Sequence, residues 1–305
     1  MNRLLIRNAR LVNEGRIRDA DVLVEDERIA RIDTGIAAPP DAEVIDAEGK
    51  YLLPGMVDDQ VHFREPGLTH KGDLASESAA AAAGGITSFM DMPNVNPQTT
   101  NLEALADKYR VAEGRCTANY GFYLGGTNTN IEEIRKLQVG NACGIKVFMG
   151  ASTGDMLVDD PAVLEQIFAH APGMVVTHCE DSPTIWRNEA RARDTYGEDV
   201  PMSEHPRIRS AEACLASSEM AIDLARRHDA LLHVLHHLLL HALGLLGDHR
   251  LGDVHRIGSD QHVHHAFLGD AIELLLELVA HILGHVFAQR LDCARFHAKG
   301  LDEFL

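Results

Sequence analysis

Basic residues are few in this sequence: 28 lysines and arginines stand against 46 aspartates and glutamates, for a formal net charge of −18 at pH 7. Nucleic acids and anionic membranes attract proteins with basic surfaces, so this balance argues against both as partners. No apolar run reaches the ~18 residues that a membrane span requires, and the first residues lead into charged ones unlike a signal peptide. We expect a small molecule as the partner.

Cysteine is also scarce, with five residues, at positions 116, 143, 179, 214 and 293. Their number is odd, their spacing is irregular, and no Cys-x-x-Cys pair occurs. This usage suits reduced thiols better than a disulfide framework, and we therefore expect a cytoplasmic protein.

The first 50 residues alternate short apolar runs with charged residues, a pattern typical of short antiparallel strands with one solvated face. We predict a small β-appendage over residues 1–50. At 305 residues the chain can bury a large core in addition to such an appendage.

From residue 51 onward, apolar strand-like runs alternate with helix-like segments. The strands are expected near residues 55, 88, 121, 146, 175 and 233, and the helices over residues 71–83, 101–113, 130–137, 161–169 and 209–227. Repeated strand–helix units form a parallel sheet, and about eight of them in ~250 residues close a TIM-type barrel. We predict an α/β fold in which residues 51–236 form a TIM-type (β/α)8 barrel that is incomplete after its sixth strand.

Residues 237–305 have a different character. They are rich in leucine and histidine, and strand–helix alternation is lost. A histidine-rich tract can bind metal. The plainer interpretation, which we favour, is an atypical tail that does not continue the barrel in the ordinary way.

Residues 58–67, with the sequence DDQVHFREPG, contain the most informative stretch. Side chains alternate along a strand, so Gln60, His62 and Arg64 project to one side. Neutral histidine binds zinc, and arginine binds a carboxylate through two parallel hydrogen bonds. A lone histidine and a surface arginine near a turn are an equally compatible interpretation of the spacing.

Polar residues recur where the predicted strands end, which is where such barrels place their active sites. These residues are His62, Arg64, Asn94, Lys146, His178 and His236. Each has a simple structural explanation; Lys146, for example, could extend its amine to the surface. A lysine within an apolar strand nevertheless loses solvation, which lowers its pKa toward that of a nucleophilic amine. Such an amine can take up carbon dioxide to form a carbamate, and three histidines with that carbamate would make a binuclear zinc site.

These motifs resemble those of the cyclic amidohydrolases, and most closely the dihydroorotases, over about residues 3–236. Residues 58–67 resemble the opening motif that binds metal and substrate in that family. The other matching motifs are Met92-Pro93-Asn94 with Asn96-Pro97, Lys146-Val147-Phe148-Met149, and Leu232-His233-Val234-Leu235-His236.

The resemblance implies a (β/α)8 barrel that interconverts dihydroorotate and N-carbamoyl-L-aspartate in pyrimidine biosynthesis. It also implies metal ligands and a carboxylate-binding pair. The ligands would be His62, Lys146, His178 and His236, holding two Zn²⁺ ions bridged by carboxylated Lys146. Arg64 and Asn94 would bind the substrate carboxylate.

Two departures from the family pattern stand out. Gln60, a weak metal ligand, occupies a position where most relatives have a second histidine. The family's late Thr-Asp-His-Ala-Pro-His-like segment, whose aspartate shuttles a proton, is missing where it is expected. Asp260, within Gly258-Ser259-Asp260-Gln261-His262, is the candidate for that catalytic role, although so short a match is more readily explained by chance.

Two alternatives to a dihydroorotase remain open. One is a related ring hydrolase, such as a hydantoinase, dihydropyrimidinase or allantoinase. The other is a catalytically impaired barrel that serves as a partner subunit, or a frameshifted, truncated or rearranged product. In the second case open sheet edges would favour association, including homo-oligomers. Zinc content measured together with turnover of dihydroorotate separates these alternatives.

Overall fold

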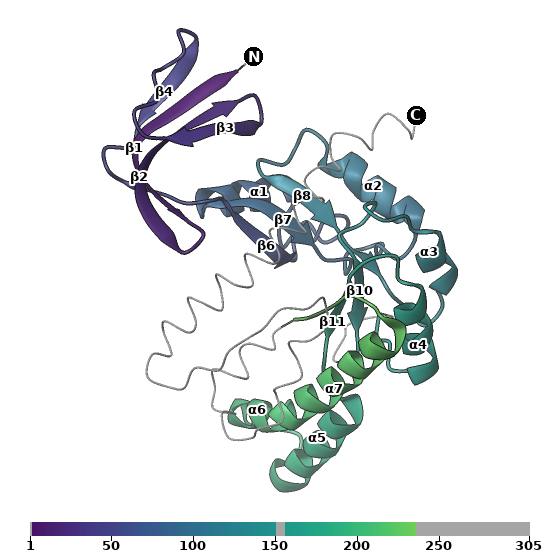
Figure 1. The fold of residues 1–305 in the computed structure, drawn as a ribbon. Coiled ribbons are helices and arrows are strands. Elements are labelled where there is room, and N and C mark those ends of the chain that lie inside the picture. Colours follow the sequence, from purple (N-terminus) through teal and green to yellow (C-terminus); the bar gives the residue numbers. More distant parts are fainter. Residues whose placement is uncertain (1, 151–155, 236–305) are drawn as a thin grey trace. The chain divides into compact units, whose positions relative to one another are not determined.

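The structure is a computed structural model that describes residues 2–150 and 156–235. These residues divide into two units between Met56 and Val57, and each unit is described by itself (Figure 1). The predicted tail, the metal ligand His236 and the catalytic candidate Asp260 lie outside the described residues.

The first unit is a β-sheet. Its strands β1 (Arg3–Asn13), β2 (Arg16–Glu25) and β3 (Arg28–Asp33) pair antiparallel, as predicted. The expectation that all its strands are antiparallel is wrong, because β4 (Ala42–Asp46) and β5 (Tyr51–Leu52) both run parallel to β1. The reason is topological: β4 lies on the side of β1 opposite β2, so residues 34–41 form a crossover connection and not a hairpin.

The second unit contains the strands predicted for the barrel. They are β6 (Met56–Val61), β7 (Ile86–Asp91), β8 (Asn119–Phe122), β9 (Leu124–Gly125), β10 (Ile145–Phe148), β11 (Val175–His178) and β12 (Leu232–Val234). Only Tyr123 separates β8 from β9, and its N–H donates to Asp91 on β7 while Leu124 donates to Gly144 before β10. The sheet therefore runs in the order β6-β7-β8/β9-β10-β11-β12.

Parallel pairing connects β7 to β8, β9 to β10, β10 to β11, and β11 to β12. The predicted α/β class and parallel sheet are confirmed. Long connections are required between parallel neighbours, and helices fill most of them.

The helices are α1 (Leu74–Ala83), α2 (Leu102–Ala112), α3 (Ile131–Lys136), α4 (Pro161–His170), α5 (Ser182–Tyr196), α6 (His205–Ile208) and α7 (Ala211–His228), with a short 3₁₀ turn at Met202–Glu204. Side chains of Asp73, Asn101, Asp160, Asp181 and Ser210 accept hydrogen bonds from the first turns of α1, α2, α4, α5 and α7. These caps satisfy backbone donors that have no partner inside the helix.

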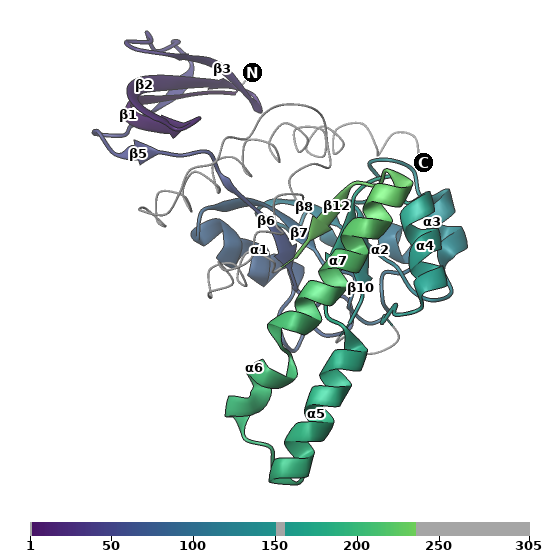
Figure 2. The same cartoon turned by 60° about the horizontal axis from the view of Figure 1, so that its bottom comes forward.

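The sequence analysis did not predict α5 and α6, which pack against each other (Figure 2). α5 also contacts α7. α5 buries only Ser182 and Ala192, so it lacks the apolar stripe by which a core-facing helix is recognised.

The two faces of the second unit's sheet have different surroundings. Helices α1, α2 and α7 contact β7, β8 and β12, and they enclose a large apolar core that includes Phe89 and Phe122. Side chains that project away from this core form a separate small cluster, which includes Met92, Tyr123 and Val176. Alternation along β10 places Lys146 between the core residues Ile145 and Val147, so its side chain projects to the second face.

The sheet is strongly curved. Nε2 of His233 on β12 lies 3.2 Å from Oδ2 of Asp59 on β6, although these strands are at opposite ends of the sheet order. At about 4.8 Å per strand, five strand spacings in a flat sheet would separate them by roughly 24 Å. The contact therefore requires the sheet to curl.

Within the described part of the chain, no helix has both the length and the apolarity needed to cross a membrane.

Candidate active site

Three of the predicted site residues meet where β6 and β7 end. Nδ1 of His62 lies 2.9 Å from the amide oxygen Oδ1 of Asn94. Nη1 of Arg64 donates to the backbone carbonyl of Asn94 at 3.4 Å. Because an amide oxygen only accepts, Nδ1 of His62 carries the proton and Nε2 keeps its lone pair.

The environment of His62 favours its neutral form. Burial, together with the positive charge of Arg64, lowers the pKa of His62 to about 4, and the contact with Asn94 opposes this only partly. A neutral imidazole with a free Nε2 lone pair is the form that binds a metal ion.

The loops that follow β6 and β7 touch through their backbones. The N–H of Asn96 donates to the carbonyl of Pro66 at 3.0 Å. Gly67 has a φ of +80°, and a Cβ atom there would lie 1.8 Å from the carbonyl oxygen of Asn96. Only glycine allows this approach, which brings Arg64 and Asn94 within reach of each other.

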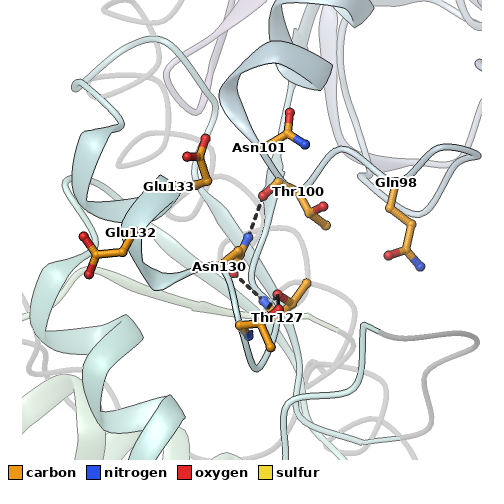
Figure 3. Close-up of a pocket in the computed structure, with 8 residues that line it drawn as sticks. Gln98, Thr100, Asn101, Thr127, Asn130, Glu132 and Glu133 are labelled. Atoms are coloured by element: carbon orange, nitrogen blue, oxygen red, sulfur yellow. Dashed lines mark hydrogen bonds between the residues drawn. The ribbon is translucent and has the colours of Figure 1, made fainter.

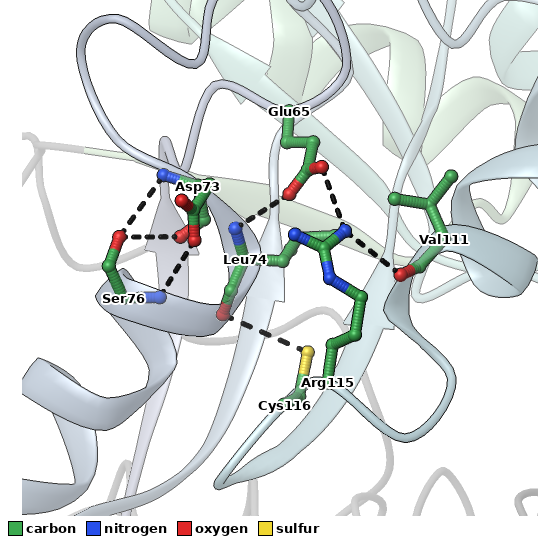
Figure 4. Close-up of polar contacts among 7 residues, drawn as sticks. All are labelled: Glu65, Asp73, Leu74, Ser76, Val111, Arg115 and Cys116. Carbon is green, nitrogen blue, oxygen red and sulfur yellow. Dashed lines mark hydrogen bonds and ion pairs between the residues drawn. The ribbon is translucent and has the colours of Figure 1, made fainter.

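Glu65 fixes the first of these loops from the other side (Figure 4). Its Oε2 accepts from the N–H of Leu74 at the start of α1, and its Oε1 accepts from Nη1 of Arg115 at 2.8 Å. Arg115 also donates to the carbonyl of Val111 near the end of α2. The loop carrying His62 and Arg64 is thereby tied to two helices.

Lys146 is buried, with 1% of its surface exposed, so it does not extend its amine to solvent. Among the described residues its ammonium has no hydrogen-bond partner, and it lies 4.6 Å from the centre of the Phe148 ring. Burial lowers the pKa of Lys146 to about 7. A buried amine without a partner is poorly stabilised as a cation and is available for chemical conversion.

His178 is the last residue of β11, next to Phe148 in the pairing with β10. Its Nε2 lies 2.7 Å from Oε2 of Glu180. Glu180 also accepts two hydrogen bonds from the guanidinium of Arg209. Burial opposes ionisation of Glu180, but the hydrogen bonds from His178 and Arg209 outweigh it and lower the pKa of Glu180 to about 2.

An ionised Glu180 can only accept, so His178 donates to it from Nε2. The sequence analysis assigned no role to Glu180. The available signal was a carboxylate two residues after a candidate ligand, since metal-binding histidines usually donate their other ring N–H to a carboxylate, a carbonyl or water. The neighbouring Asp181 is engaged as the N-cap of α5.

The described residues fit a metal ion in part. They contain no group of three or more histidine, cysteine, aspartate or glutamate residues placed to hold one. They do bring a lone-pair nitrogen of His62, the ring of His178 and the amine of Lys146, which has no hydrogen-bond partner among these residues, to one sheet. If that amine became a carbamate, this set would supply two nitrogen donors and two oxygens, which suits zinc.

A separate polar pocket of about 420 Å³ lies between the first turns of α2 and α3 (Figure 3). Its lining residues are Gln98, Thr100, Asn101, Thr127, Thr129, Asn130, Glu132 and Glu133. Asn130 donates to the carbonyl of Thr100 and accepts from the N–H of Thr127. None of the predicted site residues lines this pocket.

Comparison with known proteins agrees with the motifs. An L-hydantoinase of Paenarthrobacter aurescens is 34% identical over 206 residues, which are 66% of this chain and 45% of the relative. A dihydroorotase of Methanosarcina acetivorans is 32% identical over 245 residues, which are 79% of this chain and 51% of the relative. No family model matches the sequence.

The fold has a similar counterpart among solved structures. The structure of L-hydantoinase (dihydropyrimidinase) from Arthrobacter aurescens superposes with a TM-score of 0.72 and 30% identity, over 77% of this chain and 52% of that chain. The matches show that the chain belongs to the cyclic amidohydrolase superfamily. The chain spans about half the length of the curated relatives that it matches.

Proposed function

We propose that the chain is a zinc-dependent hydrolase of cyclic amides, of the dihydroorotase type. The observation that carries the proposal is the meeting of His62, Arg64 and Asn94 at the ends of β6 and β7. The amine of Lys146, which has no hydrogen-bond partner among the described residues, lies on the same sheet as His62, which supports one shared site.

In this proposal His62, His178 and carboxylated Lys146, with His236, would hold two zinc ions. Bound zinc lowers the pKa of water and polarises a carbonyl oxygen. The residues of the chain have separate tasks. Asn94 fixes the proton of His62 on Nδ1, Glu180 fixes that of His178 on Nε2, and burial keeps Lys146 in a reactive form.

Arg64 with Asn94 favours a substrate that bears a carboxylate. The guanidinium has five N–H donors in a planar fork that matches a carboxylate. Asn94 accepts from His62 through its oxygen, which leaves its NH₂ group to donate to the same carboxylate. Dihydroorotate carries such a carboxylate on its ring, whereas unsubstituted hydantoin does not.

We also propose that the curved sheet of β6–β12 is part of a (β/α)8 barrel, since the contact between His233 and Asp59 supports a curl of that kind. Hydrolysis of a ring amide also needs a group that moves a proton to the leaving nitrogen. We retain Asp260 as the candidate for this role.

A substrate panel tests the proposal. Purified chain supplied with zinc is assayed with dihydroorotate, dihydrouracil, hydantoin, a 5-substituted hydantoin and allantoin. We expect hydrolysis of dihydroorotate to be fastest. Preference for a hydantoin would favour the second candidate function, to which the structural similarity to L-hydantoinase points. No hydrolysis of any ring would contradict the proposal and favour a non-enzymatic role.

A further inference from the structure

A buried ion pair lies behind the candidate active site, between the sheet and α2. Nζ of Lys108 on α2 is 2.8 Å from Oδ2 of Asp91, the last residue of β7, and both side chains are 0% exposed. Neither residue belongs to the proposed metal ligands or to the carboxylate-binding pair.

Each partner also forms a hydrogen bond with a site loop, and the Lys108 ammonium in addition lies 4.9 Å from the centre of the Phe122 ring. Oδ1 of Asp91 accepts from the N–H of Phe63 at 3.0 Å, between His62 and Arg64 in the chain. Nζ of Lys108 donates to the carbonyl of Met92 at 2.9 Å, at the start of the segment that carries Asn94. The pair therefore connects the loop after β6 to the loop after β7.

Stability alone does not explain this pair. Removing two charges from water costs more than most buried pairs regain, and apolar residues of similar volume are often equally stabilising. What a buried pair provides is a fixed geometry, because displacing either partner leaves a charge unpaired. The geometry fixed here is the relative position of two loops whose contact is made by His62, Arg64 and Asn94.

We propose that Asp91 and Lys108 are positioning residues that hold these two loops in register, so that Asn94 meets both His62 and Arg64. The effect on substrate binding rests on the proposed function. The effect on the loops does not.

The experiment compares wild type with the double variant Asp91→Leu/Lys108→Met, which removes both charges and both loop contacts. The new side chains are similar in shape, since Leu branches at Cγ as Asp does and Met is unbranched as Lys is. Hydrogen–deuterium exchange is followed in peptides covering residues 62–67 and 93–99. We expect exchange there to accelerate at least about tenfold, with little change in residues 145–148 and 175–178 and a melting temperature within about 5 °C of wild type. Unchanged loop exchange, or uniform acceleration across the unit, overturns the proposal.

A second double variant covers the case in which the first does not fold. In Asp91→Asn/Lys108→Met the amide oxygen still accepts from Phe63, so faster exchange is expected only in residues 93–99. If residues 93–99 exchange at the same rate in this variant as in wild type, the proposal is overturned. The matched control is Ser78→Ala, since Ser78 is fully buried on α1 and bonds to Thr117 and Ala75, neither of which belongs to the two loops. It should leave exchange in both loops unchanged.

Kinetic measurements separate the effect of the ion pair on the two loops from its effect on substrate binding. With zinc present, the Leu/Met variant should raise the KM for dihydroorotate at least about tenfold while kcat falls less, because loop register governs the carboxylate contact. An unchanged KM with faster loop exchange contradicts the role in substrate positioning. If wild type hydrolyses no cyclic amide, the proposed function fails, and the exchange result still decides whether the pair holds the loops.

Discussion

Arg64 has a φ of +70°, in the left-handed backbone region that costs a residue with a side chain about 1–2 kcal/mol. Its carbonyl accepts from the N–H of Leu68, and Glu65 next to it is bonded to two helices, so the loop imposes this conformation. Backbone strain of this kind clusters at functional sites, where surrounding contacts maintain it. The strain supports a binding role for the guanidinium.

Substituting Arg64 with methionine should therefore weaken substrate binding without removing the metal. Loss of a charge-assisted, two-bond contact costs roughly 2–4 kcal/mol, or about thirty- to a thousandfold in the dissociation constant for dihydroorotate. Titration calorimetry measures the binding, and elemental analysis should find unchanged zinc. Arg135→Met, an exposed change on α3, is the control. Wild-type affinity in Arg64→Met would remove Arg64 from the carboxylate site.

A second prediction at the scale of single residues concerns Glu180. In Glu180→Gln a neutral amide replaces the carboxylate and no longer attracts the proton on Nε2 of His178. That proton can then move to Nδ1, the nitrogen that would bind zinc in the proposed site. Loss of such an orienting partner typically weakens metal binding by about 10- to 100-fold, measured by zinc competition with a chelator. Asp181→Asn is the matched control, because asparagine also caps a helix. Equal zinc affinity in Glu180→Gln and wild type would contradict this role.

At the scale of elements, the meeting of the loops after β6 and β7 depends on Gly67. Gly67→Ala combines a left-handed φ with a Cβ placed on the carbonyl of Asn96, so the two loops must separate. We expect a loss of more than about 2 kcal/mol of unfolding free energy, together with weaker dihydroorotate binding. Gly35→Ala has a similar φ and open space around it, and should cost only about 1–2 kcal/mol. Equal losses in the two variants would show that the loops can accommodate the methyl group.

The sequence predicted the elements whose signals are local. The strands and five of the helices follow from apolar runs and capping residues, such as Asn101 before α2. The sequence did not predict α5, whose surface is mostly polar, or the parallel pairing of β4 with β1, because that pairing joins distant segments. Local pattern carries no information about such a partner.

The candidate site could also be predicted from the sequence only where its signals are local. Its residue types were visible as polar side chains at strand ends, and the family resemblance suggested their roles. The contacts that orient them were not visible. Glu180 is bonded to Arg209, which is 29 residues away, and Asp91 to Lys108 on a helix, so only the folded chain shows these pairs.

At the scale of the whole molecule, Lys146 makes the stability of the metal-free protein depend on pH. Its pKa is lowered from 10.5 to about 7 in the folded chain, so across that window the unfolded chain binds more protons. The free energy of unfolding should therefore rise as pH increases from about 7 toward 10.5. Urea unfolding in carbon-dioxide-free buffer measures it, with Lys146→Met expected to flatten the rise and the exposed Lys136→Met expected to keep it. Parallel curves for wild type and Lys146→Met would contradict the low pKa.

The central claim is that Lys146 and the histidines on this sheet hold zinc for hydrolysis of a cyclic amide. The most direct test measures zinc content and dihydroorotate turnover in wild type and in Lys146→Ala, each with and without short carboxylic acids. The account predicts zinc and turnover in wild type, loss of both in Lys146→Ala, and partial recovery when an added acid fills the space. Full zinc occupancy in Lys146→Ala, or wild-type chain that binds no zinc, would contradict it.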